Sequence, residues 1–208
     1  MRYCVFMTLH SKRITAGLAA VAAAIALSAC GTATKEDRGA PDSPAASAGV
    51  ESGHNTDDVM FAQMMIPHHQ QAVELAGLVP DRSTNPALIA LAATIAGQQQ
   101  PEINAMKAML AQWEVKPGEM LHEGAHGMTM AGMVDDATMI KLEALKGPEF
   151  DTLWLTSMIG HHQGAIEMAG VEIADGNNVD MVGLARVIVT AQRAEIDQMT
   201  QMLAGMEG

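Results

Sequence analysis

Two pairs of adjacent histidines, His68-His69 and His161-His162, are the residues of this chain best suited to chemistry. Imidazole is a common ligand for copper, zinc and iron, and helical bundles build metal sites from imidazoles and carboxylates on facing helices. Because a similar sequence surrounds each pair, we expect both to serve one purpose. The histidines therefore predict a metal site in the interior of a bundle.

Carboxylates and thioethers share the helix faces that carry these histidines. At 100° per residue, Asp58 and Met65 lie near the stripe that the first pair straddles, and Glu102 lies on the apolar face of a second segment, beside Gln99. The corresponding residues recur around the second pair. The ligands predicted inside the bundle are His68, His69, His161, His162, Glu102, Glu195, Asp58, Asp151, Met65 and Met158.

A metal-free interpretation of the same residues also stands. Glu102 and Glu195 would accept hydrogen bonds from the histidines, Asp58 and Asp151 would orient the rings, and the network would fix the register of the helices. Buried polar groups must pair with something, and this interpretation pairs them with each other.

The segment from Met120 to Met133 holds four methionines and two histidines among glycines. Thioether and imidazole together favour copper, particularly Cu(I), over hard cations. The predicted ligands here are His122, His126, Met128, Met130 and Met133. Alternatively, this is a flexible loop whose methionines fill space at the end of the bundle.

The elements that must position these residues form an internal repeat. Residues 58–77 match 151–170 at ten of twenty positions, and 91–110 match 184–203 at nine, both at an offset of 93. Apolar residues recur every three or four positions in all four segments, which predicts four helices. Two such hairpins, 57–113 and 150–206, would bury one common core. The predicted fold is therefore all-α, a four-helix bundle with a short extra helix in the connection.

Punctuating residues set the predicted ends of these helices. Asp57 or Asp58 suits the first start, Asn85-Pro86 the second and Asn177-Asn178 the fourth. Pro101 removes a backbone donor, so the second helix should be continuous but bent. In the connection, Asp135-Asp136 and Gly147 read as the start and stop of the extra helix.

The first 29 residues combine basic side chains with a short apolar run and end before Cys30, the pattern of a lipoprotein signal peptide. We expect cleavage before Cys30 and lipidation of its thiol, followed by a disordered tether over 30–56 and a folded domain over 57–208. This places the domain at the extracytoplasmic face of the cell membrane. The alternative is an ordinary signal peptide in which Cys30 is incidental.

Charge restricts the partners further. The chain carries a formal charge of −12, and because the first 29 residues contain three basic groups and no acidic ones, the remainder carries −15. Nucleic acid would be repelled and cations attracted. The expected partners are the membrane, reached through the lipid anchor, and metal ions, while a homodimer is left open. No nucleophile, phosphate-binding loop or nucleotide signature indicates catalytic residues.

The pattern Asp-x-x-aromatic-x-x-x-Met-Ile-x-His-His-Gln-x-Ala, followed by Gln-x-x-Glu-Ile-x-x-Met, resembles the bacterial domain-of-unknown-function 305 family from about Asp57 to Met206. The resemblance implies a ferritin-like four-helix bundle and, since some members are associated with periplasmic copper binding and tolerance, copper as the ion. It implies as ligands the histidines of both pairs and the connecting methionines. Pro67 and Pro101 depart from Gly160 and Ala194 of the second copy.

These observations lead to three hypotheses. The first is a membrane-anchored extracytoplasmic protein that sequesters or passes on copper. The second is a ferritin-like redox enzyme whose histidines and carboxylates hold a dinuclear iron or manganese centre. The third is a metal-free interaction module of the cell surface.

Overall fold

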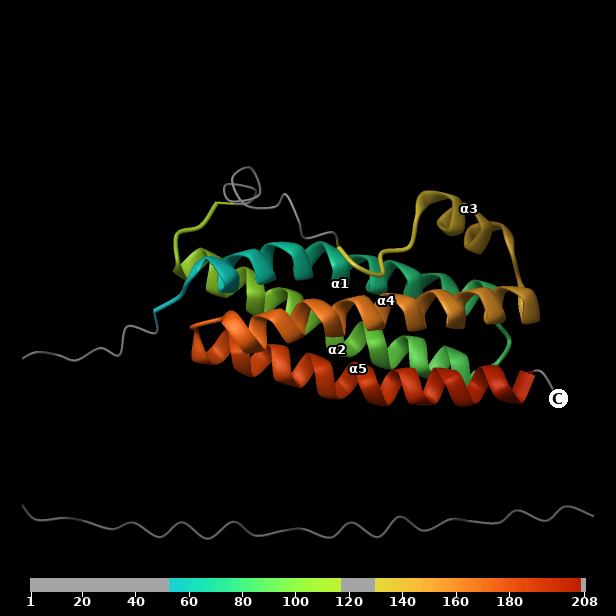
Figure 1. Ribbon diagram of the computed structural model, residues 1–208. Helices are drawn as coiled ribbons and strands as arrows, with labels where there is room; N and C mark the ends of the chain where they lie inside the picture. The colour runs from blue at the N-terminus through green and yellow to red at the C-terminus, as the bar shows by residue number, and fades with distance from the viewer. Residues whose placement is uncertain (1–52, 117–129, 207–208) are drawn as a thin grey trace, which may run out of the picture. The chain divides into compact units, whose positions relative to one another are not determined.

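The structure, a computed structural model, describes residues 53–116 and 130–206, and these residues form α-helices and no strand. The helices are α1 (Thr56–Arg82), α2 (Pro86–Gln112), α3 (Asp136–Ala144), α4 (Gly147–Asp175) and α5 (Val179–Met206) (Figure 1). All of them belong to one compact unit, Ala48–Gly208. The predictions for the signal peptide, Cys30, most of the tether, His122, His126 and Met128 lie outside the described residues.

Capping residues explain where the helices begin. The first helix starts earlier than predicted, because Asn55 is its N-cap and Asp58 closes a capping box from the third helical position. The Asn85-Pro86 start is confirmed: the Asn85 side chain accepts the backbone N–H of Ala87 at 3.0 Å. Asn178 likewise accepts from the N–H of Met181 at 3.0 Å at the start of α5.

The predicted extra helix is present as α3, and Asp135 caps it by accepting from the Thr138 N–H at 2.7 Å. Gly147 does not end it, however. This glycine is the first residue of α4 and has a φ of 64°, a conformation that favours glycine. The second helix is continuous through Pro101, as predicted, and α1 continues through Pro67 and Pro80.

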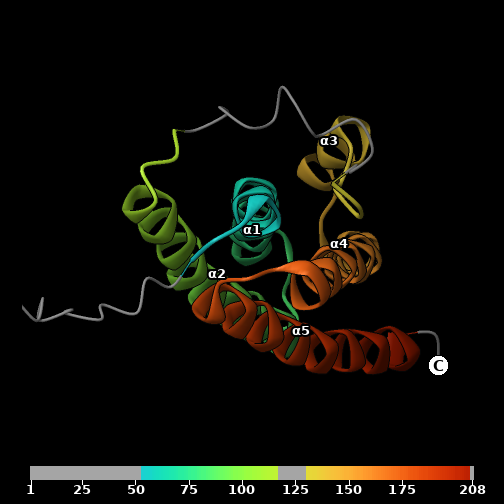
Figure 2. The ribbon, with the colours of Figure 1, turned by 60° about the vertical axis from the view of Figure 1, so that its left-hand side comes forward.

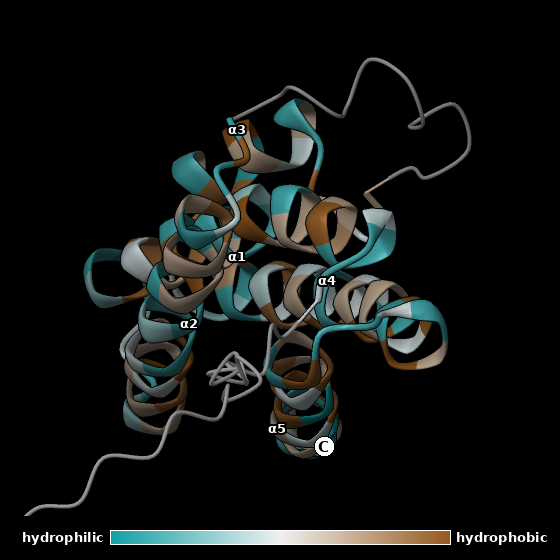
Figure 3. Cartoon of the chain, turned by 90° about the vertical axis from the view of Figure 1, so that its left-hand side faces the viewer, coloured by the Kyte–Doolittle hydropathy of each residue, from teal (hydrophilic) through white to brown (hydrophobic). Residues whose placement is uncertain are grey.

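The two hairpins, α1 with α2 and α4 with α5, join mainly through α1 and α4, which run antiparallel. Contacts between α2 and α5 are few, and α3 lies outside the four long helices, beside α4 (Figure 2). Hydrophobic and hydrophilic residues alternate along each helix (Figure 3), and the buried hydrophobic ones form two apolar clusters. Trp154, fully buried, donates its indole N–H to the carbonyl of Leu75 at 2.8 Å and so ties α4 to α1. The all-α four-helix bundle predicted from the repeat, with its short extra helix, is confirmed.

Candidate metal centre

The first histidine of each pair lies where α1 crosses α4. The rings of His68 and His161 pack against each other as a tilted pair, with centroids 3.8 Å apart and planes inclined by 38°, and both side chains are fully buried. Because these residues are equivalent in the repeat, the pseudo-twofold axis of the bundle passes between the two rings. The repeated hairpins therefore meet at their histidines.

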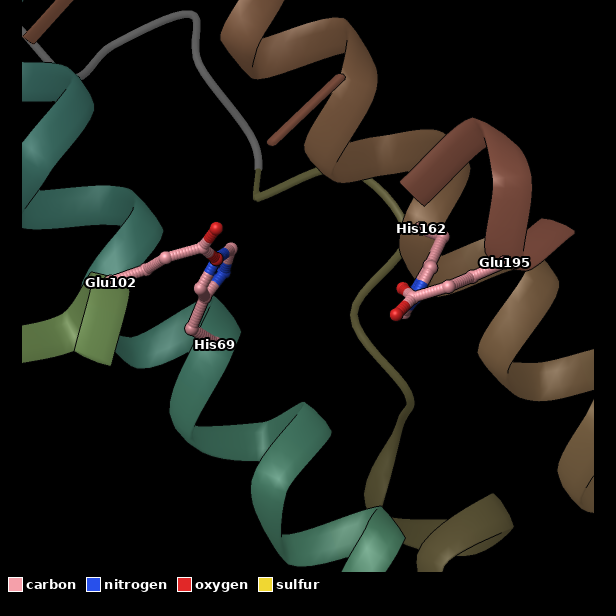
Figure 4. Close-up of polar contacts among 4 residues, drawn as sticks. All are labelled: His69, Glu102, His162 and Glu195. Carbon is pink, nitrogen blue, oxygen red and sulfur yellow. The ribbon is translucent and has the colours of Figure 1, made fainter. Parts of the chain in front are cut away.

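The second histidine of each pair faces a glutamate of its own hairpin. His69 Nε2 lies 2.9 Å from Glu102 Oε2, and His162 Nε2 lies 2.7 Å from Glu195 Oε2. Figure 4 shows the two pairs as separate units, each with its side chains pointing toward one another. The Gln-x-x-Glu segments thus bring their carboxylates to the imidazoles, as the helical spacing predicted.

The end of the connection closes one side of the tilted ring pair. The carbonyl oxygen of Ala131 accepts a hydrogen bond from His68 Nε2 at 3.0 Å. Gly132, with a φ of 80°, and Gly164 permit this approach, because a side chain on Gly164 would collide with the Ala131 carbonyl. Gln71 holds the residues that follow. Its side-chain amide donates to the carbonyl of Val134 and its side-chain oxygen accepts the N–H of Val134, both at 2.8 Å.

Burial keeps the tilted pair of imidazoles neutral. Desolvation lowers the pKa of His68 to about 4, with an opposing contribution from the bond to Ala131 and a smaller lowering from neighbouring imidazoles. Desolvation, and next the nearness of His68, lower the pKa of His161 to about 2. At neutral pH each ring therefore retains a lone pair that a metal ion can accept.

Several buried polar atoms in this region have no hydrogen-bond partner among the described residues. They are Nδ1 of His68, His69, His161 and His162, Nε2 of His161, both amide atoms of Gln99 and Gln192, and Oε1 of Glu195. Imidazole nitrogens without a partner fit a copper ion chemically. Within residues 53–116 and 130–206, however, no three His, Cys, Asp or Glu side chains are arranged to hold one ion together.

Asp58 is not brought to the histidines. It precedes His68 by ten residues on one helix, a rise of about 15 Å. Its carboxylate instead accepts the backbone N–H groups of Asn55 at 2.6 Å, Asn177 at 3.1 Å and Asn178 at 2.9 Å. Asp58 therefore fastens the turn between α4 and α5 to the start of α1, and the predicted role in orienting a ring does not fit this arrangement.

The other predicted ligands take different positions. Asp151 is buried, and its Oδ1 has no hydrogen-bond partner in the part of the chain that the structure describes. Met65 and Met158 are fully buried in the two apolar clusters of the core. Met130 is 39% exposed beside the Ala131 segment, and Met133 is half-buried there.

Glu172 is a buried acid that the sequence analysis missed. It is 1% exposed, and its carboxyl group lies beside the side chain of Asp58. Burial, and next a hydrogen bond with the Asp58 side chain, raise the pKa of Glu172 to about 8. The repeat contained a signal for it, because the equivalent residue of the first copy is the buried Val79.

Comparisons with known proteins place this bundle in a family. The sequence pattern of "Domain of unknown function (DUF305)" matches residues 58–203. A DUF305 protein from Streptomyces coelicolor, assigned as secreted, is 32% identical with a TM-score of 0.66, covering 73% of this chain and 94% of its own. A DUF305 fragment from Deinococcus radiodurans is 34% identical with a TM-score of 0.64, covering 73% and 97%.

A third similar structure is CopM in its Cu(I)-bound form, 30% identical with a TM-score of 0.60 over 73% of this chain and 98% of CopM. CopM structures with Cu(II) and with silver are similar to the chain as well. A search of curated proteins gives no match. With its family pattern spanning both histidine pairs, the chain belongs to the DUF305 family.

Proposed function

We propose that this protein binds copper outside the cytoplasm and sequesters the ion or passes it on. The ligands proposed first are the imidazoles of His68, His69, His161 and His162. Copper is the cargo in this proposal, and no reaction is assigned to it.

The observation that carries the proposal is the state of His161. Its ring is fully buried, and neither ring nitrogen has a hydrogen-bond partner within the described chain. An unpartnered buried polar atom costs about 1–3 kcal/mol. A metal ion bound by the ring would offset that cost. If the position served only to fill the core, an apolar side chain in place of His161 would carry no such cost.

Similarity to CopM supports copper as the ion. Structures similar to this chain over nearly three quarters of its length contain Cu(I), Cu(II) and silver. Silver and Cu(I) are soft monovalent ions, which imidazole and thioether ligands suit better than Mg²⁺ or Ca²⁺. Because no three of these side chains are arranged around one ion within the described residues, binding calls for a shift of the helices that carry the imidazoles.

The connection supplies a route to the buried rings in this proposal. Met130 is exposed, and the next residue, Ala131, contacts His68 directly. We assign to Met130 and Met133, together with His122, His126 and Met128, the capture of the ion at the surface. Met65 and Met158 are assigned to core packing, because both are enclosed in apolar clusters.

We propose further that the first 29 residues act as a signal peptide and that lipid on Cys30 attaches the bundle to the outer face of the membrane. The family member from Streptomyces coelicolor is assigned as secreted, which supports an extracytoplasmic location. Along the described chain, no helix is long and apolar enough to cross a membrane.

The closed His–Glu pairs favour a second candidate, a metal-free bundle whose polar network fixes helix register. This candidate predicts that substitution of the histidines alters stability and leaves the metal content of the purified protein unchanged.

Metal analysis of histidine variants tests the proposal. We expect the wild-type protein, purified from its envelope, to bind Cu(I) and Ag(I) in calorimetric titration. His68→Leu with His161→Leu, which keeps the core apolar, should lose most of this binding while retaining its helical circular dichroism. His54→Ala is the control, because His54 is an exposed histidine that stacks on Trp113 at 4.5 Å.

Unchanged copper binding by the double variant would refute the bundle site. If only the replacement of Met128, Met130 and Met133 by Leu removed copper, the site would move to the connection. Iron or manganese in the native protein, lost from the histidine variant, would favour the dinuclear enzyme instead.

A further inference from the structure

Three of the four core imidazoles direct Nε2 at an oxygen atom that accepts hydrogen bonds. His68 faces the Ala131 carbonyl, and His69 and His162 face the carboxylates of Glu102 and Glu195, at distances between 2.7 and 3.0 Å. Neither a carbonyl nor a carboxylate has a proton to donate, so the hydrogen must sit on Nε2. The same three rings bury Nδ1 without a partner.

A neutral imidazole that carries its hydrogen on Nε2 has its lone pair on Nδ1. We propose that Glu102, Glu195 and the Ala131 carbonyl are positioning groups that fix this tautomer, and that Nδ1 of His68, His69 and His162 is the atom that binds the metal. This inference rests on the proposed function. It changes the predicted role of both glutamates, which would act through the histidines and not as ligands.

The chemistry of metal sites supports such a division of roles. A histidine that ligates a metal almost always donates its other ring N–H to a carboxylate or a carbonyl, which fixes the ring orientation and makes the ligating nitrogen more basic. Both His–Glu pairs join residues 33 positions apart in equivalent places of the repeat. The arrangement therefore belongs to the repeated unit and occurs once in each hairpin.

A purely structural role leaves the other side of each ring unexplained. If the pairs served only to fix helix register, a buried Nδ1 would cost stability without return, because a lone pair without a donor loses its hydration. The same atom is left unpartnered in all four rings. A soft cation, which accepts an electron pair, accounts for the unpartnered Nδ1 of each ring.

His161 differs from its counterpart His68 in its contact with the described end of the connection. Ala131 accepts a hydrogen bond from His68, whereas the ring of His161 has only a weak contact with the backbone of His68 and no hydrogen bond within residues 53–116 and 130–206. No positioning group therefore fixes the tautomer of His161. This ring can present either nitrogen to an ion.

Nitrogen NMR of the histidine side chains tests the tautomers in the metal-free protein. We expect long-range ¹⁵N–¹H spectra of the ¹⁵N-histidine-labelled chain at neutral pH to show Nε2–H for His68, His69 and His162. On addition of Ag(I), the Nδ1 resonances of these rings should shift strongly and those of Nε2 only slightly. Nδ1–H tautomers in the free protein, or a metal-induced shift centred on Nε2, would overturn the assignment.

Substitution of Glu195 tests its positioning role. Glu195→Ala removes the acceptor, so Ag(I) affinity should fall by about 10–100-fold, the usual effect of losing such a partner. The His162 tautomer should also become mixed in the metal-free spectrum. Glu195→Gln keeps an oxygen acceptor and should restore most of the affinity. Asp197→Ala is the control, since Asp197 is exposed on the same helix.

The outcomes separate this inference from the proposed function. Wild-type affinity in Glu195→Ala would overturn the positioning role even if silver binds at the histidines. A wild-type protein that binds no Ag(I) would overturn the proposed function together with the ligand assignment. Wrong tautomers in the metal-free protein would overturn the assignment alone.

Discussion

Several side chains in this bundle bury polar atoms that have no hydrogen-bond partner among the described residues. The rings of His68 and His161 stay neutral because desolvation lowers the pKa of each. Glu172 shows the opposite shift for the same reason, since burial disfavours the charged form of an acid and of a base alike. Protonation state in this core is therefore set mainly by exclusion from water.

Glu172 predicts how stability depends on pH. Its pKa is raised from 4.5 in the unfolded chain to about 8 in the folded one. Stability from this group is full below pH 4.5 and is lost as the pH rises toward 8, because the unfolded chain releases the proton first. The loss is at most about 1.4 kcal/mol for each pH unit in that window.

Urea unfolding at several pH values between 4.5 and 8 checks this prediction. Glu172→Gln cannot ionise, so its stability relative to wild type should increase steadily across the window. Glu172→Val, which copies the equivalent Val79, should behave in the same way. Parallel pH profiles of wild type and both variants would show that Glu172 is ionised in the folded protein.

For single residues, the sequence predicted which side chains face the interior of the bundle but not which atoms they contact there. Helical spacing correctly directed His69 and Glu102 inward, because the angle around a helix depends only on residue number. It also directed Asp58 inward, but could not show that the partners of this carboxylate are N–H groups of a turn 119 residues away. Which residues meet across a contact between two helices depends on the axial offset of one helix relative to the other, and the helical spacing of a sequence does not give this offset.

At the level of the helices, the end of the connection accounts for one difference between the two copies of the repeat. Gln71, which grips Val134, is replaced at the equivalent position by Gly164, which leaves room for the Ala131 carbonyl. The two copies thus differ at the position where residues 131–134 pack against α1 and α4. Gln71 holds the segment against α1, and Gly164 makes room for it on α4.

A methyl group at Gly164 tests this packing. Gly164→Ala would force the added carbon against the Ala131 carbonyl, and overpacking of this kind costs about 1–3 kcal/mol. Gly160→Ala is the matched control on the same helix, because a side chain there meets no other atom within 4 Å. Replacing this helical glycine should be neutral or stabilise by up to about 1 kcal/mol.

Chemical denaturation of both variants measures the difference. Equal stabilities of Gly164→Ala and Gly160→Ala would mean that the Ala131 segment does not pack on α4 as the structure describes.

The number, order and pairing of the long helices could be read from the sequence because each copy of the repeat supplied the same evidence twice. The capping residues Asn85 and Asn178 acted as predicted, since a cap depends on neighbours within three residues. The first helix start was misplaced by two or three positions because Asp58 resembled a cap and in fact completes the capping box of Asn55. The path of Ala131 over the histidines had no local signature.

For the whole molecule, duplication and charge act together in the proposed function. Two hairpins related by a pseudo-twofold bring two imidazoles face to face, which neither hairpin achieves alone. The strongly acidic chain attracts cations to the surface. In our proposal the connection takes up copper there, and the buried rings hold it away from water.

X-ray absorption spectroscopy of the protein loaded with one equivalent of Cu(I) tests most directly whether the buried imidazoles hold the ion. We predict imidazole scattering around copper in the wild-type protein and in Met130→Leu with Met133→Leu, and its loss in His68→Leu with His161→Leu. Copper surrounded by sulfur alone in the wild-type protein would contradict the account.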